Sequence, residues 1–181
     1  IALLDRVSRY SQPRALLRGD KVGKFDCGVD SLNSWFRTLA LRNQESGTSR
    51  TFITVDDDGQ IAGFYSLSSF SVVRAEVGDA GAGMPDPIPA TLIGRLAVHV
   101  KHRGQGLGVS LLRDAVERAV RVSLEIGSAA IIAHARDESV VSFYEQFGFA
   151  RLDGDKLTVM IPMVDAVATI RSLETDGEVR A

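Results

Sequence analysis

Apolar residues recur at helical spacing in two segments of the chain. The first segment has Asp30 or Ser31 as a suitable N-terminal cap. Its apolar positions follow one another at intervals of three or four: Leu32, Trp35, Phe36, Leu39 and Ala40. The second segment runs from about residue 107 to 126, and one face of it carries Leu111, Leu112, Ala115, Ala119 and Val122. A shorter helix is expected over 140–147.

Runs of β-branched and aromatic residues predict the strands. Residues 51–55 and 60–73 are separated by the turn sequence Asp56-Asp57-Asp58-Gly59, which indicates a hairpin. Further strands are expected over three ranges: 90–100, 129–133 and 157–163 with Pro162 near its end. Strands are therefore followed by strand–helix–strand–helix–strand, and this order predicts an α/β fold.

The segment from Gly78 to Pro89 separates the hairpin from the later strands. It contains Gly78, Gly81 and Gly83 and three of the five prolines of the chain. Such a composition is typical of a loop, and we expect a mobile one.

Length and composition fit one ordinary soluble domain. The chain has 181 residues, 45% of them hydrophobic, with no apolar run long enough to cross a membrane and no targeting segment at the start. Cys27 is the single cysteine, which favours a reducing compartment and hence the cytoplasm. The three scattered histidines predict no metal site. The polar tail over 174–181 is expected to fray.

Charge is unevenly distributed along the chain. The formal net charge is -2, which argues against a protein that coats nucleic acid generally. Residues 1–50 nevertheless carry a net +4, and residues 51–100 carry a net -4. A local basic surface in the N-terminal quarter is therefore compatible with the overall balance.

A glycine-rich turn stands between a predicted strand and the long predicted helix. Its sequence is Arg103-Gly104-Gln105-Gly106-Leu107-Gly108. Glycines let the backbone approach a ligand and point several N–H groups at one spot, where the helix dipole also favours an anion. The turn predicts a pyrophosphate site. It is neither a P-loop nor a dinucleotide-binding fingerprint, because the spacing of its glycines differs from both.

A second element, Ser142 to Phe149, is an aromatic-rich helix that ends at Gly148 and leads into a strand. Taken alone, its Tyr144 reads as one more core aromatic. The glycine turn, as Arg103-x-x-Gly106-x-Gly108, resembles the acetyl-CoA signature of the GNAT superfamily of N-acetyltransferases. The element around Tyr144, which stands 36 residues after Gly108, resembles the later helix and strand of that superfamily. The resemblance covers roughly residues 14–165. It implies one acetyltransferase domain over 1–181, with a mixed central sheet, flanking helices and a splayed strand pair that binds acetyl-CoA.

Three further stretches resemble one branch of that superfamily, the TacT/AtaT-type toxins: Phe25 to Gly28, Ser31 to Trp35 and Asn43 to Phe52. These bacterial enzymes acetylate the amino acid of charged tRNA and are encoded with a ribbon-helix-helix antitoxin. The likeness implies an aminoacyl-tRNA substrate, inhibition of translation, an antitoxin partner and the capacity to form a homodimer.

The resemblance also assigns roles to individual residues. Tyr144 is implied as the general acid that protonates the departing thiolate of coenzyme A. The residues implied to bind acetyl-CoA are Leu96, Ala97, Val98, Arg103, Gly104, Gln105, Gly106, Leu107, Gly108, Ser139 and Phe143. The basic residues matched to tRNA contacts are Arg37, Arg42 and Arg95.

The general base is left open by the sequence. An α-amino group has a pKa of about 7.7–8.0, so a useful fraction is neutral at cellular pH without a dedicated base. The carboxylates of Glu76, Asp86 and Glu138 stay candidates.

Two alternative functions remain at this point. One is a GNAT enzyme that acetylates a protein N-terminus, a lysine or a small amine. The other is a module that binds coenzyme A or an antitoxin without turnover, which the intact Arg103–Gly108 turn and Tyr144 disfavour.

Overall fold

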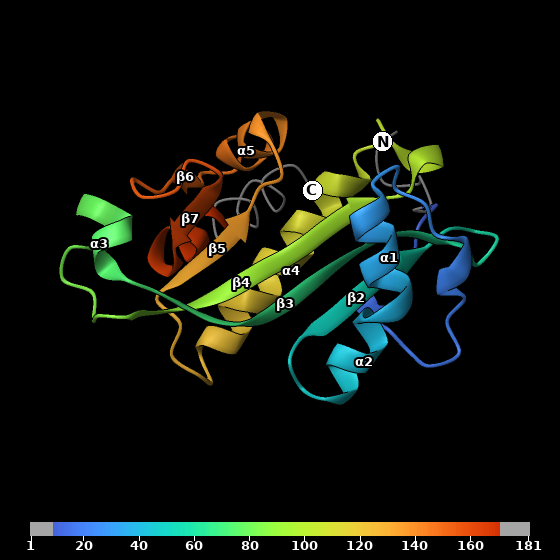
Figure 1. Ribbon diagram of the computed structural model, residues 1–181, viewed down its shortest axis with the longest axis horizontal. Helices are drawn as coiled ribbons and strands as arrows, with labels where there is room; N and C mark the ends of the chain where they lie inside the picture. The colour runs from blue at the N-terminus through green and yellow to red at the C-terminus, as the bar shows by residue number, and fades with distance from the viewer. Residues whose placement is uncertain (1–8, 171–181) are drawn as a thin grey trace, which may run out of the picture. The chain divides into compact units, whose positions relative to one another are not determined.

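The computed structural model describes residues 9–170 and shows a mixed α/β fold (Figure 1). Seven strands are hydrogen-bonded in the order β1-β2-β3-β4-β5-β7-β6. Their bounds are β1 Arg14–Ala15, β2 Arg50–Val55, β3 Ile61–Val72, β4 Ile88–Val98, β5 Ala130–His134, β6 Ala150–Arg151 and β7 Thr158–Pro162. The pair β4–β5 is parallel, whereas β1–β2, β5–β7 and β6–β7 are antiparallel. The predicted fold class is confirmed.

Within the described residues, five α-helices and three short 3-10 helices connect these strands, and residues 163–170 after β7 are also helical. The α-helices are α1 Asp30–Thr38, α2 Ala40–Glu45, α3 Arg74–Val77, α4 Leu107–Ser123 and α5 Glu138–Glu145. The 3-10 helices are η1 Val22–Lys24, η2 Gly78–Gly81 and η3 Val100–His102. No described helix has the length and apolar character that crossing a membrane requires.

The chain divides into two compact units. Among the described residues, unit 1 comprises 9–66 with 95–114, and unit 2 comprises 67–94 with 115–170. Each unit has a hydrophobic cluster of its own. A single acetyltransferase domain over 1–181 stays a prediction, and the tail over 174–181 lies outside the described residues.

The core of unit 1 is built around three phenylalanine rings. Phe36 stacks on Phe64 with 4.1 Å between ring centroids, and Phe25 packs edge-on against both rings at 5.0 and 5.3 Å. Trp35 and Phe36 come from the predicted apolar face of α1, which packs against β3. This burial explains why the apolar positions of the helix recur every three or four residues.

The first helix differs from its prediction at both ends. The cap position is Val29, and neither Asp30 nor Ser31 caps the helix with its side chain, since Asp30 is already helical. At the other end, Leu39 has a φ of -117°, and a second helix begins at Ala40.

Two other expectations need correction, and two short strands were missed. Val122 does not belong to the buried face of α4: it is 49% exposed, because the helix ends one residue later at Ser123. The segment Gly78–Pro89 is not a loop throughout, since η2 occupies its start and β4 already begins at Ile88. The short edge strands β1 and β6 were not predicted, because two residues carry no periodic signal.

The parallel pair β4–β5 ends before β4 does. Its register runs from Ala90↔Ala130 to Ile93↔Ala133 in unit 2. β4 continues to Val98, and within the part of the chain that the structure describes no β5 residue pairs beyond Ile93. The last part of β4 is therefore free on the side of β5, which is the splay that the resemblance implies.

Asn33 joins α1 to the loop that precedes it. It is 5% exposed; its Oδ1 accepts a hydrogen bond from the backbone N–H of Cys27 at 2.9 Å, and its Nδ2 donates to Asp26 Oδ1 at 2.8 Å. The same Asp26 oxygen accepts from Gly28 N at 2.7 Å. One side chain thus satisfies a buried donor and fixes the turn at residues 26–28.

We expect Asn33→Ala to lower the free energy of unfolding by about 1–3 kcal/mol, because it strands the buried N–H of Cys27. Urea denaturation measures the change. Ser34→Ala, at the exposed neighbour on the same helix, should stay within about 0.5 kcal/mol of the wild type. Equal stabilities of the two variants would contradict this role of Asn33.

Candidate active site

The glycine turn in unit 1 is open and has two residues in the left-handed backbone conformation. Gly104 and Gly106 have φ values of 71° and 78°, in the left-handed region that favours glycine. A Cβ placed on either would meet no atom within 4 Å, so backbone conformation, and not crowding, requires glycine here. α4 begins at Leu107, and the first N–H groups of a helix have no intrahelical acceptor. The turn can therefore offer backbone donors to a phosphate.

Arg103 anchors this turn to the segment before α1. Its Nη2 donates a hydrogen bond to the carbonyl oxygen of Cys27, and a Cβ on Gly28 would lie 3.0 Å from that nitrogen. Gly28 is thus needed both for its φ of 74° and for the close approach of the guanidinium. Arg103, which the resemblance implies as an acetyl-CoA contact, thus also has a structural contact within the protein.

A buried histidine holds the other side of the turn. His102 is 6% exposed, and its Nε2 lies 3.3 Å from Asp56 Oδ2. Tyr10 places its hydroxyl 3.1 Å from His102 Nδ1 and donates to Gln105 Oε1 at 2.7 Å. Burial lowers the pKa of His102, and Asp56 opposes that effect. These contacts form a network of Asp56, His102, Tyr10 and Gln105, which fixes the position of Gln105 in the turn.

Sequence analysis missed Tyr10, Asp56 and His102. Tyr10 and His102 are 92 positions apart, and no local pattern connects residues at that separation. An isolated antiparallel bridge pairs Tyr10 with Asp56 and so places the N-terminal segment beside the end of β2. Only the tertiary structure reveals that the N-terminal segment supports the turn.

The predicted pantetheine-binding residues Leu96, Ala97 and Val98 lie on the free part of β4. Ala97 is buried, whereas Leu96 and Val98 are half-buried. A Cβ on Gly63 of β3 would lie 3.1 Å from the carbonyl oxygen of Ala97 and 2.7 Å from Leu111 Cδ1. Gly63 therefore permits the close packing that holds this segment of β4 in place.

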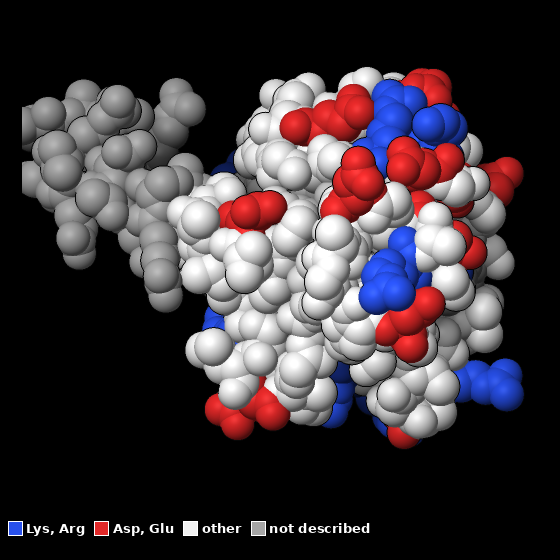
Figure 2. All heavy atoms as spheres, turned by 90° about the vertical axis from the view of Figure 1, so that its left-hand side faces the viewer, with Lys and Arg blue, Asp and Glu red and all other residues white. Residues whose placement is uncertain are grey.

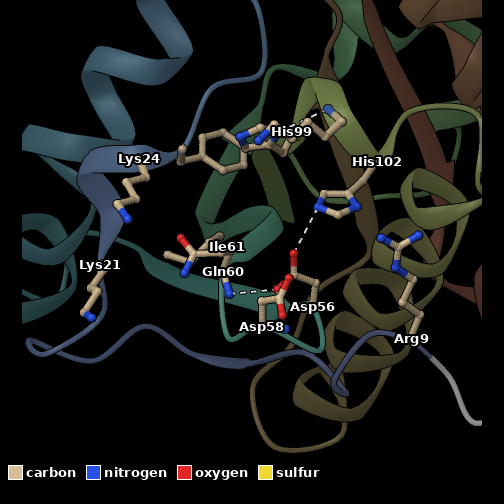
Figure 3. A pocket seen from close by; sticks show the side chains of 11 residues that line it. Arg9, Lys21, Lys24, Asp56, Asp58, Gln60, Ile61, His99 and His102 are labelled. Atoms are coloured by element: carbon tan, nitrogen blue, oxygen red, sulfur yellow. Dashed lines mark hydrogen bonds and ion pairs between the residues drawn. The ribbon is translucent and has the colours of Figure 1, made fainter.

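A cavity of about 420 Å³ opens beside the network, also within unit 1. Figure 3 shows Lys21 and Lys24 on one side of it and Arg9 and His102 on the other, with Asp56 between. Lys101 also lines it. Asp56 is engaged by His102 and by the backbone N–H groups of residues 58 and 60. The three lysines have no ion pair with another described residue.

In unit 2, α5 carries the remaining predicted site residues. Asp137 caps the helix, since its Oδ1 accepts from Ser139 N at 3.0 Å, Val140 N at 3.2 Å and Ser139 Oγ at 2.6 Å. The hydrogen bond from Ser139 contributes most to lowering the pKa of Asp137 to about 2. The Ser139 hydroxyl therefore has an internal role in capping α5.

Tyr144 is buried, with 4% of its surface exposed. Its ring packs against Phe143 and Phe149, with centroids 5.4 and 5.3 Å away. Burial raises the pKa of Tyr144, so its hydroxyl stays protonated at neutral pH. Within the described part of the chain, this hydroxyl makes no hydrogen bond. It is a proton donor without an internal acceptor.

The carboxylates considered as bases are mostly engaged. Glu138 Oε2 lies 2.7 Å from Arg151 Nη1, and Asp86 accepts from the backbone N–H of Arg74 at 3.0 Å. Glu76 on α3 packs its side chain against Gly154. The structure gives none of them a position that indicates catalysis.

The basic residues matched to tRNA contacts do not form one free cluster. Arg37 donates from Nη2 to the carbonyl oxygen of Phe25, and the guanidinium of Arg95 lies 4.1 Å from the centroid of the Trp35 ring. Burial lowers the pKa of Arg95. Arg42 on α2 is exposed.

Within unit 1, then, the structure gathers residues 95–98, the glycine turn and the basic cavity. Within unit 2 it gathers Ser139, Phe143 and Tyr144 on one helix. Among the described residues, no three His, Cys, Asp or Glu side chains are placed to hold a metal ion.

Residues 48–151 match the acetyltransferase (GNAT) domain. A tRNA-acetylating toxin of Mycobacterium tuberculosis is 43% identical over 165 residues, which cover 91% of this chain and 99% of that protein. The chain belongs to the GNAT acetyltransferase family. The predicted acetyltransferase class is confirmed.

Solved structures of GNAT toxins share the fold. AtaT complexed with acetyl-methionyl-tRNAfMet has a TM-score of 0.81 at 25% identity, covering 89% of this chain and 99% of its own. AtaTR bound with AcCoA has a TM-score of 0.78 at 25% identity, covering 90% and 98%. The likeness extends over nearly the whole length of these proteins.

Proposed function

We propose that this GNAT enzyme transfers the acetyl group of acetyl-CoA to the α-amino group of aminoacyl-tRNA and thereby blocks translation. The observation that carries the proposal is the 43% identity to a protein named as a tRNA-acetylating toxin, over 99% of that protein. The structures named as AtaT with acetyl-methionyl-tRNAfMet and as AtaTR with AcCoA support the same substrates.

The residues of unit 1 fit acetyl-CoA. Gly104 and Gly106 leave the space before the α4 N-terminus open, so the backbone of the turn would hold the pyrophosphate. Leu96 to Val98 would offer backbone groups on the free side of β4 to the pantetheine arm. Acetyl-CoA supplies the activated acyl group, and the protein supplies position and electrostatics.

Tyr144 would act as the general acid. Because burial raises its pKa, the hydroxyl is protonated when the thiolate leaves, and it can donate the proton without an internal partner competing for it. The hydroxyl then recovers a proton from the nitrogen that has been acylated, through water. Phe143 packs against this tyrosine on the same helix, and Phe143 and Ser139 would contact acetyl-CoA.

We propose that tRNA contacts Arg42 and the basic cavity of unit 1, which is the cavity lined by Lys21, Lys24 and Lys101. The face in Figure 2 has separate groups of blue and red atoms around a wide uncharged area, and no continuous basic surface. In unit 1, by contrast, one cavity is lined by Lys21, Lys24 and Lys101, and none of them has an ion pair with another described residue. Arg37 and Arg95 are engaged internally and would contribute less.

The proposal includes a partner and a location. A ribbon-helix-helix antitoxin would neutralise the enzyme, in keeping with a similar structure that contains an AtaT mutant toxin bound to the C-terminus of the antitoxin AtaR. A homodimer and a cytoplasmic location complete the proposal, since charged tRNA is found there.

The decisive experiment incubates the protein with labelled acetyl-CoA and four acceptors: charged tRNA, uncharged tRNA, a polyamine and a peptide mixture. We expect label on charged tRNA alone. Label on polyamine or peptide alone would replace this proposal by the small-amine or protein alternative, and no label anywhere would favour a binding module.

Tyr144→Phe should retain acetyl-CoA binding and lose about 10²–10⁴-fold in kcat, because it removes a proton donor while keeping the ring in its packing. Calorimetry measures binding, and the labelled assay measures turnover. Phe149→Leu, which alters another ring that packs against Tyr144, serves as a packing control. A phenylalanine variant that works at the wild-type rate would remove Tyr144 from the chemistry.

Lys21→Gln combined with Lys24→Gln should weaken tRNA binding and reduce the slope of log K against log salt by up to about 2, since each phosphate contact contributes about 0.9. The KM for acetyl-CoA should not change. Lys156→Gln, an exposed lysine in unit 2, is the matched control. If the KM for acetyl-CoA rises while the tRNA slope stays the same, the cavity holds a phosphate of coenzyme A instead.

A further inference from the structure

The point at which β4 and β5 part has a histidine on it. The last β4–β5 pair is Ile93↔Ala133, and His134 is the first β5 residue beyond it. β5 is still held from its other side there, because His134 pairs with Thr158 of β7. His134 lies on the same face of the strand as Ile132, two positions earlier, but is exposed whereas Ile132 is buried. It therefore stands at the fork of the splayed strands.

The hydrogen bonds of His134 determine which ring nitrogen carries the proton. Its Nδ1 lies 2.8 Å from Thr158 Oγ1, and that hydroxyl donates to Asp155 Oδ2 at 2.6 Å. A hydroxyl has one hydrogen, and the Thr158 hydroxyl donates it to Asp155. Thr158 Oγ1 must therefore accept a hydrogen bond from Nδ1–H of His134. In the neutral imidazole, Nε2 then carries the lone pair.

The Thr158 hydroxyl links the imidazole of His134 to a carboxylate. Hydrogen bonds from the Thr158 hydroxyl and from Leu157 N lower the pKa of Asp155, which is therefore an anion at neutral pH. Phe70 of β3 packs edge-on against the imidazole at 5.6 Å and carries no charge. No described residue donates to Nε2. An imidazolium formed here would be stabilised by Asp155 through Thr158.

We propose that His134 is the general base of the acetyl transfer, accepting a proton at Nε2 from the α-ammonium group of the acceptor. This rests on the proposed function. The freed amine forms a bond to the acyl carbon, and the carbon–sulfur bond breaks. Of the two protons that leave the nitrogen, one passes through His134 to water, and the other restores Tyr144 after it has protonated the thiolate.

His134 suits this role better than the carboxylates left open by the sequence. Glu138 is ion-paired with Arg151, and Asp86 is bonded to the backbone of α3. Below about pH 8 an α-amino group, with a pKa of about 7.7–8.0, is mostly protonated and has a proton to lose before it can attack. A base is useful in just this interval.

His134→Asn is the informative variant, because the asparagine amide can still donate to Thr158 but provides no base. We expect kcat/KM for aminoacyl-tRNA to fall at least about 100-fold at pH 6.5–7. The deficit should shrink toward pH 9, where the acceptor amine is already neutral. Acetyl-CoA binding by calorimetry and the thermal transition should match the wild type.

Two outcomes would overturn the proposal. One is wild-type kcat/KM for His134→Asn at pH 6.5–7. The other is a loss of equal size at every pH, which indicates a structural role. Thr158→Val provides a second variant: it removes the acceptor of Nδ1–H and should reduce kcat/KM less than His134→Asn does, in the same pH range.

A readout independent of turnover is the ¹⁵N spectrum of the imidazole in the free protein. We expect the hydrogen on Nδ1, and a spectrum with the hydrogen on Nε2 would contradict the proposal. If wild-type protein acetylates only small amines, the same pH comparison is made with that acceptor. Failure of the tRNA proposal and failure of the base proposal are thus separate results.

Discussion

The pairing of β4 with β5 stops at Ile93↔Ala133, and most of what this protein can do depends on that termination. A parallel pair that continued to Val98 would use its backbone groups within the sheet. Because it stops, β4 presents five further residues whose N–H and C=O groups on one side are available to a ligand. β5 remains ordered beyond the fork because β7 pairs with it through His134↔Thr158.

In each unit, the predicted site residues are held by contacts that do not take part in chemistry. In unit 1, Arg103 binds the carbonyl of Cys27, and Tyr10 and His102 fix Gln105, so the open turn at Gly104 and Gly106 has a rigid support. In unit 2, Asp137 caps the helix that carries Tyr144. A site whose groups are held before substrate arrives spends less binding energy on ordering them.

Sequence patterns were sufficient for the elements with long periodic signals. The apolar face of α4, the hairpin of β2 and β3, and the glycine turn follow from spacing, and the GNAT family from the turn together with Tyr144. The break at Leu39 and the exposure of Val122 depend on where helices end, which periodicity does not define. The support from Tyr10 and the orientation of His134 depend on partners distant in sequence, His102 and Thr158, and no local pattern encodes them.

The central claim is that the free part of β4 and the glycine turn form the acetyl-CoA site. Hydrogen exchange of the backbone amides, with and without acetyl-CoA, tests it most directly. The account predicts slower exchange on addition of acetyl-CoA over residues 94–98 and 104–108, while Arg50–Val55 of β2 is unchanged. Saturating acetyl-CoA that leaves the exchange of 94–98 and 104–108 unaltered would contradict it.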